Sequence, residues 1–150
     1  RKIDPKAVLR TTLIVGFPGE TESDFNILMK FVEDIKFDHL GVFTYSDSED
    51  LKSHHLKDHV SKEEAEKRHD MIMAAQAKIS EELNEQRIGK TVKVFIEENP
   101  EDGVYIGRTM FQAPEVDGVT FIYSDRLEIG AFVNVIITDA FEYDIAGELA

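Results

Sequence analysis

The chain of 150 residues contains no cysteine. Without a thiol it can form no disulfide, no thiolate nucleophile, no zinc ribbon and no cysteine-ligated iron–sulfur cluster. Any chemistry that depends on a thiolate-bound metal must therefore take its ligands from outside this sequence.

Long apolar runs are also missing. The longest, around Val133 to Ile137, is interrupted by Asn134 and followed by Asp139, so it is too short to span a bilayer. Residues 1–5, Arg-Lys-Ile-Asp-Pro, lack the apolar core of a secretory signal peptide. We therefore expect a cytoplasmic protein with no membrane partner.

Basic residues are scarce. The chain has 17 lysines and arginines against 30 acidic residues, which gives a formal net charge of −13. The imbalance is largest in residues 88–150, where 12 acidic residues face four cations: Lys90, Lys93, Arg108 and Arg126. Such a surface repels nucleic acid and attracts a basic protein. It can also serve solubility alone, so charge by itself leaves both interpretations open.

An apolar segment followed by a glycine-rich turn organises the first part of the chain. Leu13-Ile14-Val15 is a continuous apolar run, typical of a parallel strand covered on both faces. The turn at residues 16–19, Gly-Phe-Pro-Gly, follows it, and Thr21 is placed to cap a helix. A second apolar strand is predicted over residues 40–45. Strand, helix and strand in this order predict a right-handed parallel βαβ unit.

Parallel α/β sheets bind their ligands at the carboxyl ends of the strands. The turn after the first strand and the segment after Tyr45 should therefore lie at a functional edge. Glycine-containing tight turns are also common in loops that have no functional role, and this alternative remains open. A phosphate site is disfavoured, because no Lys-Ser/Thr pair follows Gly19 and Glu20 places a negative charge there.

The loop after the second strand contains four residues that resemble metal ligands: His54, His55, Asp58 and His59. Adjacent histidines cannot both point the same way from regular structure, and the spacing is not that of a catalytic zinc helix. We interpret these residues as solvated loop residues. A capping box at Ser61 and Glu64 then predicts a helix that continues to about Arg87 and ends before Gly89.

From Thr91 the hydrophobic period changes to two. Five strands are predicted, over residues 91–97, 104–111, 119–123, 132–140 and 142–145. Five short strands so close together suggest a small closed barrel of the OB type. Phe95, Phe121 and Phe132 are expected in its core rather than as base-stacking platforms, because cations do not flank them in the sequence.

Three motifs together resemble the carboxyl-terminal part of the radical S-adenosylmethionine methylthiotransferases. They are residues 10–21, Arg-Thr-Thr-Leu-Ile-Val-Gly-Phe-Pro-Gly-Glu-Thr; residues 41–46, Gly-Val-Phe-Thr-Tyr-Ser; and residues 113–118, Ala-Pro-Glu-Val-Asp-Gly, after Gly107-Arg-Thr. The last two favour the branch that modifies ribosomal protein S-twelve over the transfer-RNA branch. Two positions depart from the family pattern, in the loop that begins at Asp47 and at Gln112, where an aspartate is common.

The resemblance implies an α/β plus all-β architecture. Residues 1–60 would be the last βαβ elements of a partial, TIM-like radical barrel, residues 61–87 a linking helix, and residues 88–150 a five-stranded TRAM barrel. It also implies S-adenosylmethionine and two 4Fe–4S clusters, whose ligands would lie outside this segment. The segment alone would then be inactive, with no catalytic and no metal-ligating residue of its own.

The resemblance also assigns site residues. Ile14 and Gly16 would belong to the strand that packs on the adenosine of the cofactor, with Phe43 and Tyr45 on its neighbour. The TRAM barrel would dock the basic S-twelve protein, whose aspartate is modified at the β-carbon, with no direct contact to nucleic acid.

Acidic groups of the barrel are the predicted docking residues: Glu115, Asp117, Glu142 and Asp144. Glu115 and Asp117 are equally well explained as residues that shape their turn. Three other interpretations stay open. They are a fragment from the transfer-RNA branch, a stand-alone acidic module that binds a basic protein, and an RNA-binding OB protein, which the charge disfavours.

Overall fold

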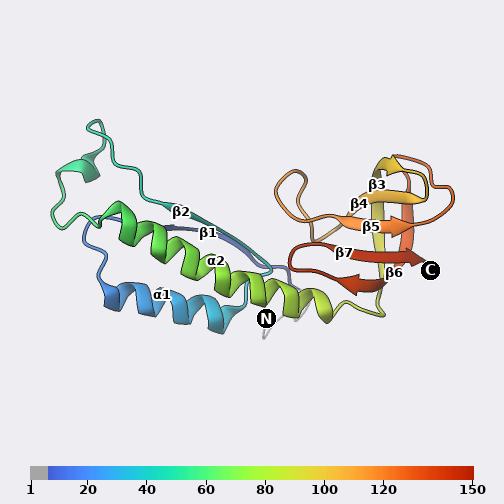
Figure 1. Cartoon of the computed structure of the whole chain (residues 1–150), viewed down its shortest axis with the longest axis horizontal. Coiled ribbons are helices and arrows are strands. Elements are labelled where there is room, and N and C mark those ends of the chain that lie inside the picture. Colours follow the sequence, from blue (N-terminus) through green and yellow to red (C-terminus); the bar gives the residue numbers. More distant parts are fainter. Residues whose placement is uncertain (1–6) are drawn as a thin grey trace. The chain divides into compact units, whose positions relative to one another are not determined.

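The computed structural model describes residues 7–150, and the chain divides between Ile79 and Ser80 into two compact units (Figure 1). Each unit has its own sheet and its own buried side chains. Residues 1–6, which include those that bear on the signal-peptide expectation, lie outside the described residues. Within residues 7–150, no helix is both long and apolar enough to cross a membrane.

The first unit contains the predicted βαβ arrangement. Strand β1 (Arg10–Val15) pairs in parallel with β2 (His39–Thr44), and α1 (Glu22–Ile35) connects them. The hydroxyl of Thr21 accepts a hydrogen bond from the N–H of Asp24, and the carboxylate of Asp24 accepts one from the N–H of Thr21. This reciprocal capping fixes the start of α1 where the sequence predicts it.

A short 3₁₀ turn, η1 (Lys52–His55), and the long helix α2 (Lys62–Glu85) follow β2. The hydroxyl of Ser61 accepts from the N–H of Glu64, as expected at the start of α2. The helices and the sheet of this unit bury a common set of apolar side chains: Val15, Phe25, Val32, Leu40, Val42, Ala65 and Ile72.

The opposite face of the β1–β2 sheet is open in the part of the chain that the structure describes. Ile14 is 58% exposed and Phe43 is 63% exposed. The prediction of a first strand covered on both faces is therefore wrong for this chain. The exposure of β1 alternates, because neighbouring side chains point to opposite faces and the buried set lies on only one of them.

The second unit is a closed barrel in the strand order β3-β4-β5-β7-β6. Its strands are β3 (Thr91–Glu101), β4 (Val104–Thr109), β5 (Thr120–Tyr123), β6 (Phe132–Ala140) and β7 (Ile145–Leu149). Neighbours pair antiparallel except β5 and β7, which are parallel. Closure leaves this sheet without a free edge and confirms the predicted five-stranded, OB-like barrel.

Four of the five barrel strands have bounds that differ from the prediction, β4 and β5 by only one or two residues. β3 continues to Glu101, beyond its predicted end at residue 97, with an irregular register against β4. The last strand covers residues 145–149 rather than 142–145. The reason is a turn in which the N–H of Phe141 donates to the carbonyl of Asp144 at 2.8 Å.

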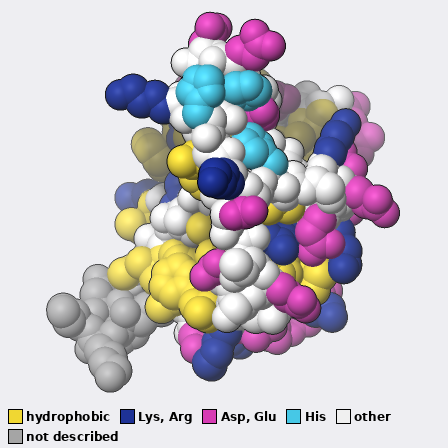
Figure 2. Space-filling model, turned by 90° about the vertical axis from the view of Figure 1, so that its left-hand side faces the viewer, with side chains coloured by type: hydrophobic (Ala, Val, Ile, Leu, Met, Phe, Trp, Pro, Cys, Tyr) yellow, Lys and Arg dark blue, Asp and Glu magenta, His cyan; other side chains and the backbone are white. Residues whose placement is uncertain are grey.

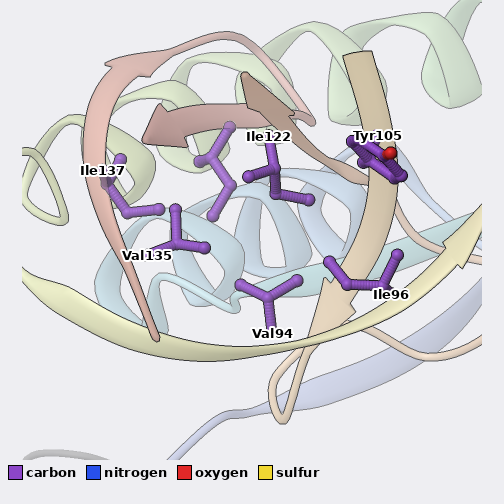
Figure 3. Close-up of a cluster of buried hydrophobic side chains, with 7 residues drawn as sticks. Val94, Ile96, Tyr105, Ile122, Val135 and Ile137 are labelled. Atoms are coloured by element: carbon purple, nitrogen blue, oxygen red, sulfur yellow. The ribbon is translucent and has the colours of Figure 1, made fainter. Parts of the chain in front are cut away.

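Seven buried side chains fill the barrel (Figure 3): Val94, Ile96, Tyr105, Ile122, Val135, Ile137 and Ile145. Most are β-branched residues, which suit a strand and pack well on its pleated surface. Phe132 is 67% exposed, so its expected place in the core is wrong. It lies on the outward face of β6, whose buried positions are Val135 and Ile137. Phe95 and Phe121 are half-buried and also occupy outward positions, on β3 and β5, so the expectation that they belong to the core is wrong for them too.

A buried glutamine holds the connection between β4 and β5. Gln112 is 6% exposed, and its Oε1 atom accepts three hydrogen bonds. The donors are the N–H of Thr109 at 2.9 Å, the hydroxyl of Thr109 at 3.1 Å and the hydroxyl of Thr120 at 2.8 Å. The residue that departs from the family pattern therefore has a structural role in this chain.

Candidate functional site

The turn between β1 and α1 is held by the side chain of Glu20. The N–H of Gly16 donates to both carboxylate oxygens of Glu20, at 3.2 and 3.1 Å. Gly16 has a φ of +77°, and a methyl group there would lie 2.5 Å from the Cβ of Ala65 in α2. Glycine is required both by the backbone angle and by the close approach of α2.

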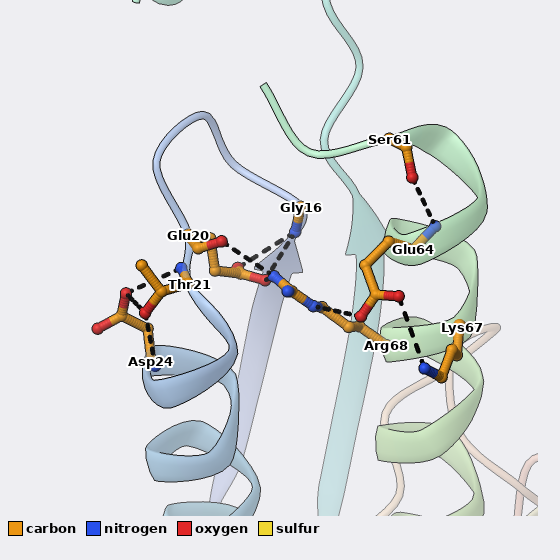
Figure 4. A network of polar contacts seen from close by, with 8 residues as sticks. All are labelled: Gly16, Glu20, Thr21, Asp24, Ser61, Glu64, Lys67 and Arg68. Carbon is orange, nitrogen blue, oxygen red and sulfur yellow. Dashed lines mark hydrogen bonds and ion pairs between the residues drawn. The ribbon is translucent and has the colours of Figure 1, made fainter. Parts of the chain in front are cut away.

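A buried arginine from α2 completes this turn (Figure 4). Arg68 is 5% exposed; it pairs with the carboxylate of Glu20 and also donates to the Glu20 carbonyl at 3.2 Å. Its Nε donates to Glu64 at 3.2 Å, and its guanidinium lies 5.4 Å from the ring centre of Phe25. The β1–α1 turn is thus joined to α2 by a charged pair.

The environment keeps Arg68 protonated. Burial by itself lowers the pKa of Arg68, but the hydrogen bonds and negative charges of Glu20 and Glu64 outweigh it and raise this pKa. A permanently charged arginine at this position therefore has a fixed partner, the carboxylate that holds Gly16.

Tyr45, directly after β2, lies beside the same turn. Its N–H donates to the carbonyl of Val15 at 2.8 Å, and its ring contacts Phe17 edge to face at 5.2 Å. Its hydroxyl lies 3.1 Å from the carboxylate of Asp47 and 2.9 Å from the hydroxyl of Ser53. The turn and the loop after β2 thus lie together at the carboxyl edge of the sheet.

The histidines of this loop pack against one another, and Figure 2 shows histidine side chains gathered on this surface. The rings of His54 and His55 are 5.4 Å apart, and those of His54 and His59 are 6.4 Å apart. A hydrogen bond from His54 at 2.9 Å lowers the pKa of Asp47. In residues 7–150, no group of three histidine or acidic side chains has the arrangement of a metal site.

The four residues assigned to the cofactor fall into two pairs. Ile14 and Phe43 lie opposite each other on the open face of the sheet. Gly41 lies on the same face with no atom within 4 Å of where its Cβ would be. Two exposed apolar side chains and an unobstructed glycine therefore form an open apolar surface on this face of the sheet. Gly16 and Tyr45 instead form the edge, and Gly16 is buried against α2.

The four acids assigned to docking have different environments. Asp117 accepts the N–H of Ala113 at 2.5 Å and so holds its own loop. Asp144 accepts the N–H of Val119 at 2.7 Å and so joins the turn before β7 to the segment before β5. Glu115 and Glu142 are exposed. Partial burial, and then the neighbouring carboxylate of Glu142, raise the pKa of Tyr143.

An aromatic pair with neighbouring cations lies on the outside of the barrel. The rings of Phe95 and Phe132 are 5.1 Å apart. The Nζ of Lys93 lies 6.0 Å from the ring centre of Phe132, and the guanidinium of Arg108 lies 5.7 Å from that of Phe95. Arg108 also donates to Glu97 at 2.5 Å. Two of the four cations of residues 88–150 are therefore next to this pair.

Comparison with known proteins accounts for both units. The family model of the TRAM domain matches residues 88–150, which contain the barrel. Over 146 residues the chain is 53% identical to "Ribosomal protein uS12 methylthiotransferase RimO" of Clostridioides difficile, an alignment that covers 97% of this chain and 33% of that protein. The chain belongs to the uS12 methylthiotransferase family. It is a carboxyl-terminal segment of such a protein and has no cysteine.

Other uS12 methylthiotransferases are similar over the same extent. The protein of Desulfosudis oleivorans is 50% identical over 149 residues, which are 99% of this chain and 34% of that protein. The protein of Fervidobacterium nodosum is 48% identical over 149 residues, again 99% of this chain and 34% of that protein. The chain thus spans about a third of the length of the curated relatives it matches. The family resemblance found in the three motifs is confirmed.

Proposed function

We propose that this chain is part of a cytoplasmic radical S-adenosylmethionine enzyme that attaches a methylthio group to the β-carbon of an aspartate in ribosomal protein uS12. The observation that carries the proposal is the 53% identity to a uS12 methylthiotransferase over 97% of the chain. In this proposal residues 1–60 belong to the radical barrel, residues 61–87 link it to the next domain, and residues 88–150 dock the substrate.

The open face of the β1–β2 sheet is the proposed place for the adenosine of S-adenosylmethionine. Ile14 and Phe43 provide the apolar surface, and Gly16 and Tyr45 set its edge. When bound and reduced, this cofactor supplies the radical that abstracts hydrogen from the substrate. The chain itself contributes placement, because two 4Fe–4S clusters need thiolates that it does not contain.

A full-length protein that contains this segment should modify uS12 after reconstitution with iron and sulfide, and the purified 150-residue chain should not. The measurement is the mass of the uS12 peptide, together with the release of 5′-deoxyadenosine and the iron content. Modification of transfer RNA alone would move the assignment to the transfer-RNA branch. Iron retention and turnover of S-adenosylmethionine by the 150-residue chain alone would contradict the proposal that the cluster ligands lie outside this segment.

The docking part of the proposal predicts a salt-dependent effect of charge. Changing Glu115→Lys together with Glu142→Lys should weaken the association of the full-length protein with uS12 about tenfold at low salt, because exposed charge pairs contribute about 0.2–1 kcal/mol each. The loss should be smaller near 0.15 M salt, where the screening length is about 8 Å. Titration of labelled uS12 at several salt concentrations measures both values.

The matched control is Glu101→Lys with Asp102→Lys. These two acids are also exposed and also belong to the barrel, Glu101 as the last residue of β3 and Asp102 in the connection to β4. The net charge changes by the same amount, so a local docking site predicts a clearly smaller effect for this pair. Equal effects would show that only the overall charge matters, and no effect of either pair would reject electrostatic docking.

One observation favours RNA binding by the barrel as a second candidate function. The exposed ring of Phe132 lies next to Phe95, with Lys93 and Arg108 beside the two rings. Aromatic rings with flanking cations can stack on single-stranded bases. Tight, salt-sensitive retardation of RNA by the full-length protein, lost in Phe132→Ala, would support this candidate. The charge of residues 88–150 opposes it.

A further inference from the structure

Arg68 is a charged residue at a buried position of α2, where apolar residues are the usual choice. It belongs to the buried side of α2, together with Ala65 and Ile72, both of them apolar and buried. Replacing a buried ion pair with apolar residues of similar size often leaves stability unchanged or improves it. A charged residue here is therefore better explained by what its partner, Glu20, has to do.

Glu20 connects Arg68 to the end of β1. Its side chain is only 12% exposed, and its two oxygens accept the same N–H of Gly16 while it pairs with Arg68. A carboxylate this far from water is unfavourable without a neighbouring cation, so in the absence of the Arg68 charge it turns toward solvent. Its hold on Gly16 then weakens, so the position of Gly16 depends on the charge of Arg68.

Gly16 in turn lies next to the proposed cofactor surface. It follows Val15, which is fully buried and whose carbonyl accepts the N–H of Tyr45 at 2.8 Å. Ile14, the exposed residue of that surface, precedes Val15 on the same strand. A displacement of Gly16 is therefore transmitted both to Ile14 on β1 and to Tyr45 at the end of β2.

We propose that Arg68 is a positioning residue, which fixes through Glu20 the carboxyl end of β1 and so the surface on which the adenosine of S-adenosylmethionine packs. This inference rests on the proposed function for the open face of the β1–β2 sheet. Arg68 itself does not reach that face, because it is buried against Phe25 and Glu20 within the first unit. It acts on the cofactor only through the turn.

The test uses the full-length protein with Arg68→Met, which keeps an unbranched apolar side chain at this buried position and removes the charge and the hydrogen-bond donors of arginine. The dissociation constant of S-adenosylmethionine should rise about tenfold, the size of change expected when one charged interaction that orders a site is removed. Deuterium exchange of the peptide that contains Gly16, measured without cofactor, should become about tenfold faster. Arg68→Lys keeps the charge and should recover part of both values.

Lys67→Met is the matched control. Lys67 is the neighbouring cation on α2, its side chain is 66% exposed, and it contacts Glu64 at 3.6 Å. Its loss removes the same charge and a contact to the same helix, but leaves Glu20 and Gly16 paired. Cofactor affinity and exchange at Gly16 should therefore stay within about twofold of the unchanged protein.

The outcomes distinguish a failure of the proposed function from a failure of the positioning role of Arg68. If the unchanged protein does not bind S-adenosylmethionine, the proposed function fails, while exchange at Gly16 still decides whether Arg68 holds the turn. If it binds and Arg68→Met changes neither value, the positioning role is wrong. Should Arg68→Met fail to fold, Glu20→Gln provides the same test from the other partner. If Arg68 and Glu20 act on the same turn, the double variant Arg68→Met, Glu20→Gln should show cofactor affinity and exchange at Gly16 no worse than those of either single variant.

Discussion

Replacing Gly16 with alanine should destabilise the first unit by about 2–5 kcal/mol. A positive φ is unfavourable by about 1–2 kcal/mol for a residue with a side chain. The new methyl group would also lie 2.5 Å from the Cβ of Ala65, and overpacking of this kind typically adds about 1–3 kcal/mol. Urea denaturation of the full-length protein, followed by hydrogen exchange in residues 7–79, measures the effect.

Gly19→Ala separates the two causes. Gly19 has a φ of +89°, yet no atom lies within 4 Å of where its Cβ would be, so only the backbone term of about 1–2 kcal/mol applies. In the Gly16→Ala protein, a second change of Ala65→Gly should restore part of the stability by removing the clash. Equal losses of stability for Gly16→Ala and Gly19→Ala, or no recovery on adding Ala65→Gly, would show that the close approach of α2 to Gly16 does not contribute.

Replacing Gln112 with alanine should destabilise the barrel by about 3 kcal/mol. Three hydrogen bonds end on its Oε1 atom, and their loss leaves the hydroxyl of Thr120, which is fully buried, without that acceptor. A buried polar group left unpaired is unfavourable by about 1–3 kcal/mol. The midpoint of thermal or urea unfolding of the barrel provides the measurement.

Gln86→Ala is the control for this prediction, because Gln86 is an exposed glutamine and no hydrogen bond of its side chain is part of the barrel. Its replacement should change stability by no more than about 0.5 kcal/mol. Gln112→Glu keeps an acceptor oxygen in place, so the stability of this variant should lie between those of the Gln112→Ala and Gln86→Ala proteins. A Gln112→Ala protein as stable as the Gln86→Ala protein would show that the connection between β4 and β5 does not depend on these bonds.

Much of the fold could be predicted because its signals are local. Thr21 and Ser61 mark two helix starts through hydrogen bonds that span three residues. Alternation of apolar side chains located four of the five barrel strands. The last strand was misplaced because its position depends on tertiary packing. A methyl group on Gly147 would lie 2.3 Å from the carbonyl oxygen of Ile136, a contact between β7 and β6 that no local pattern reveals.

The candidate site was predicted in part. The sequence located the edge formed by the turn after β1 and the loop after β2, but not what holds it. Glu20 and Arg68 are 48 positions apart, so no short motif joins them. One signal was available: a lone arginine, three positions after Ala65 and four before Ile72, lies on the apolar stripe of a predicted helix. A charge on such a stripe indicates a buried partner elsewhere in the chain.

The narrow β1–β2 sheet has a practical consequence. Within the described residues each of its two strands pairs with a neighbouring strand on one side only, so the sheet has two edges that no further strand covers, along Arg10–Val15 and along His39–Thr44. An extended segment supplied on a separate polypeptide could add to either edge. Fragment complementation, in which the missing part of a uS12 methylthiotransferase is co-expressed with this segment, is therefore a way to rebuild the enzyme from two pieces.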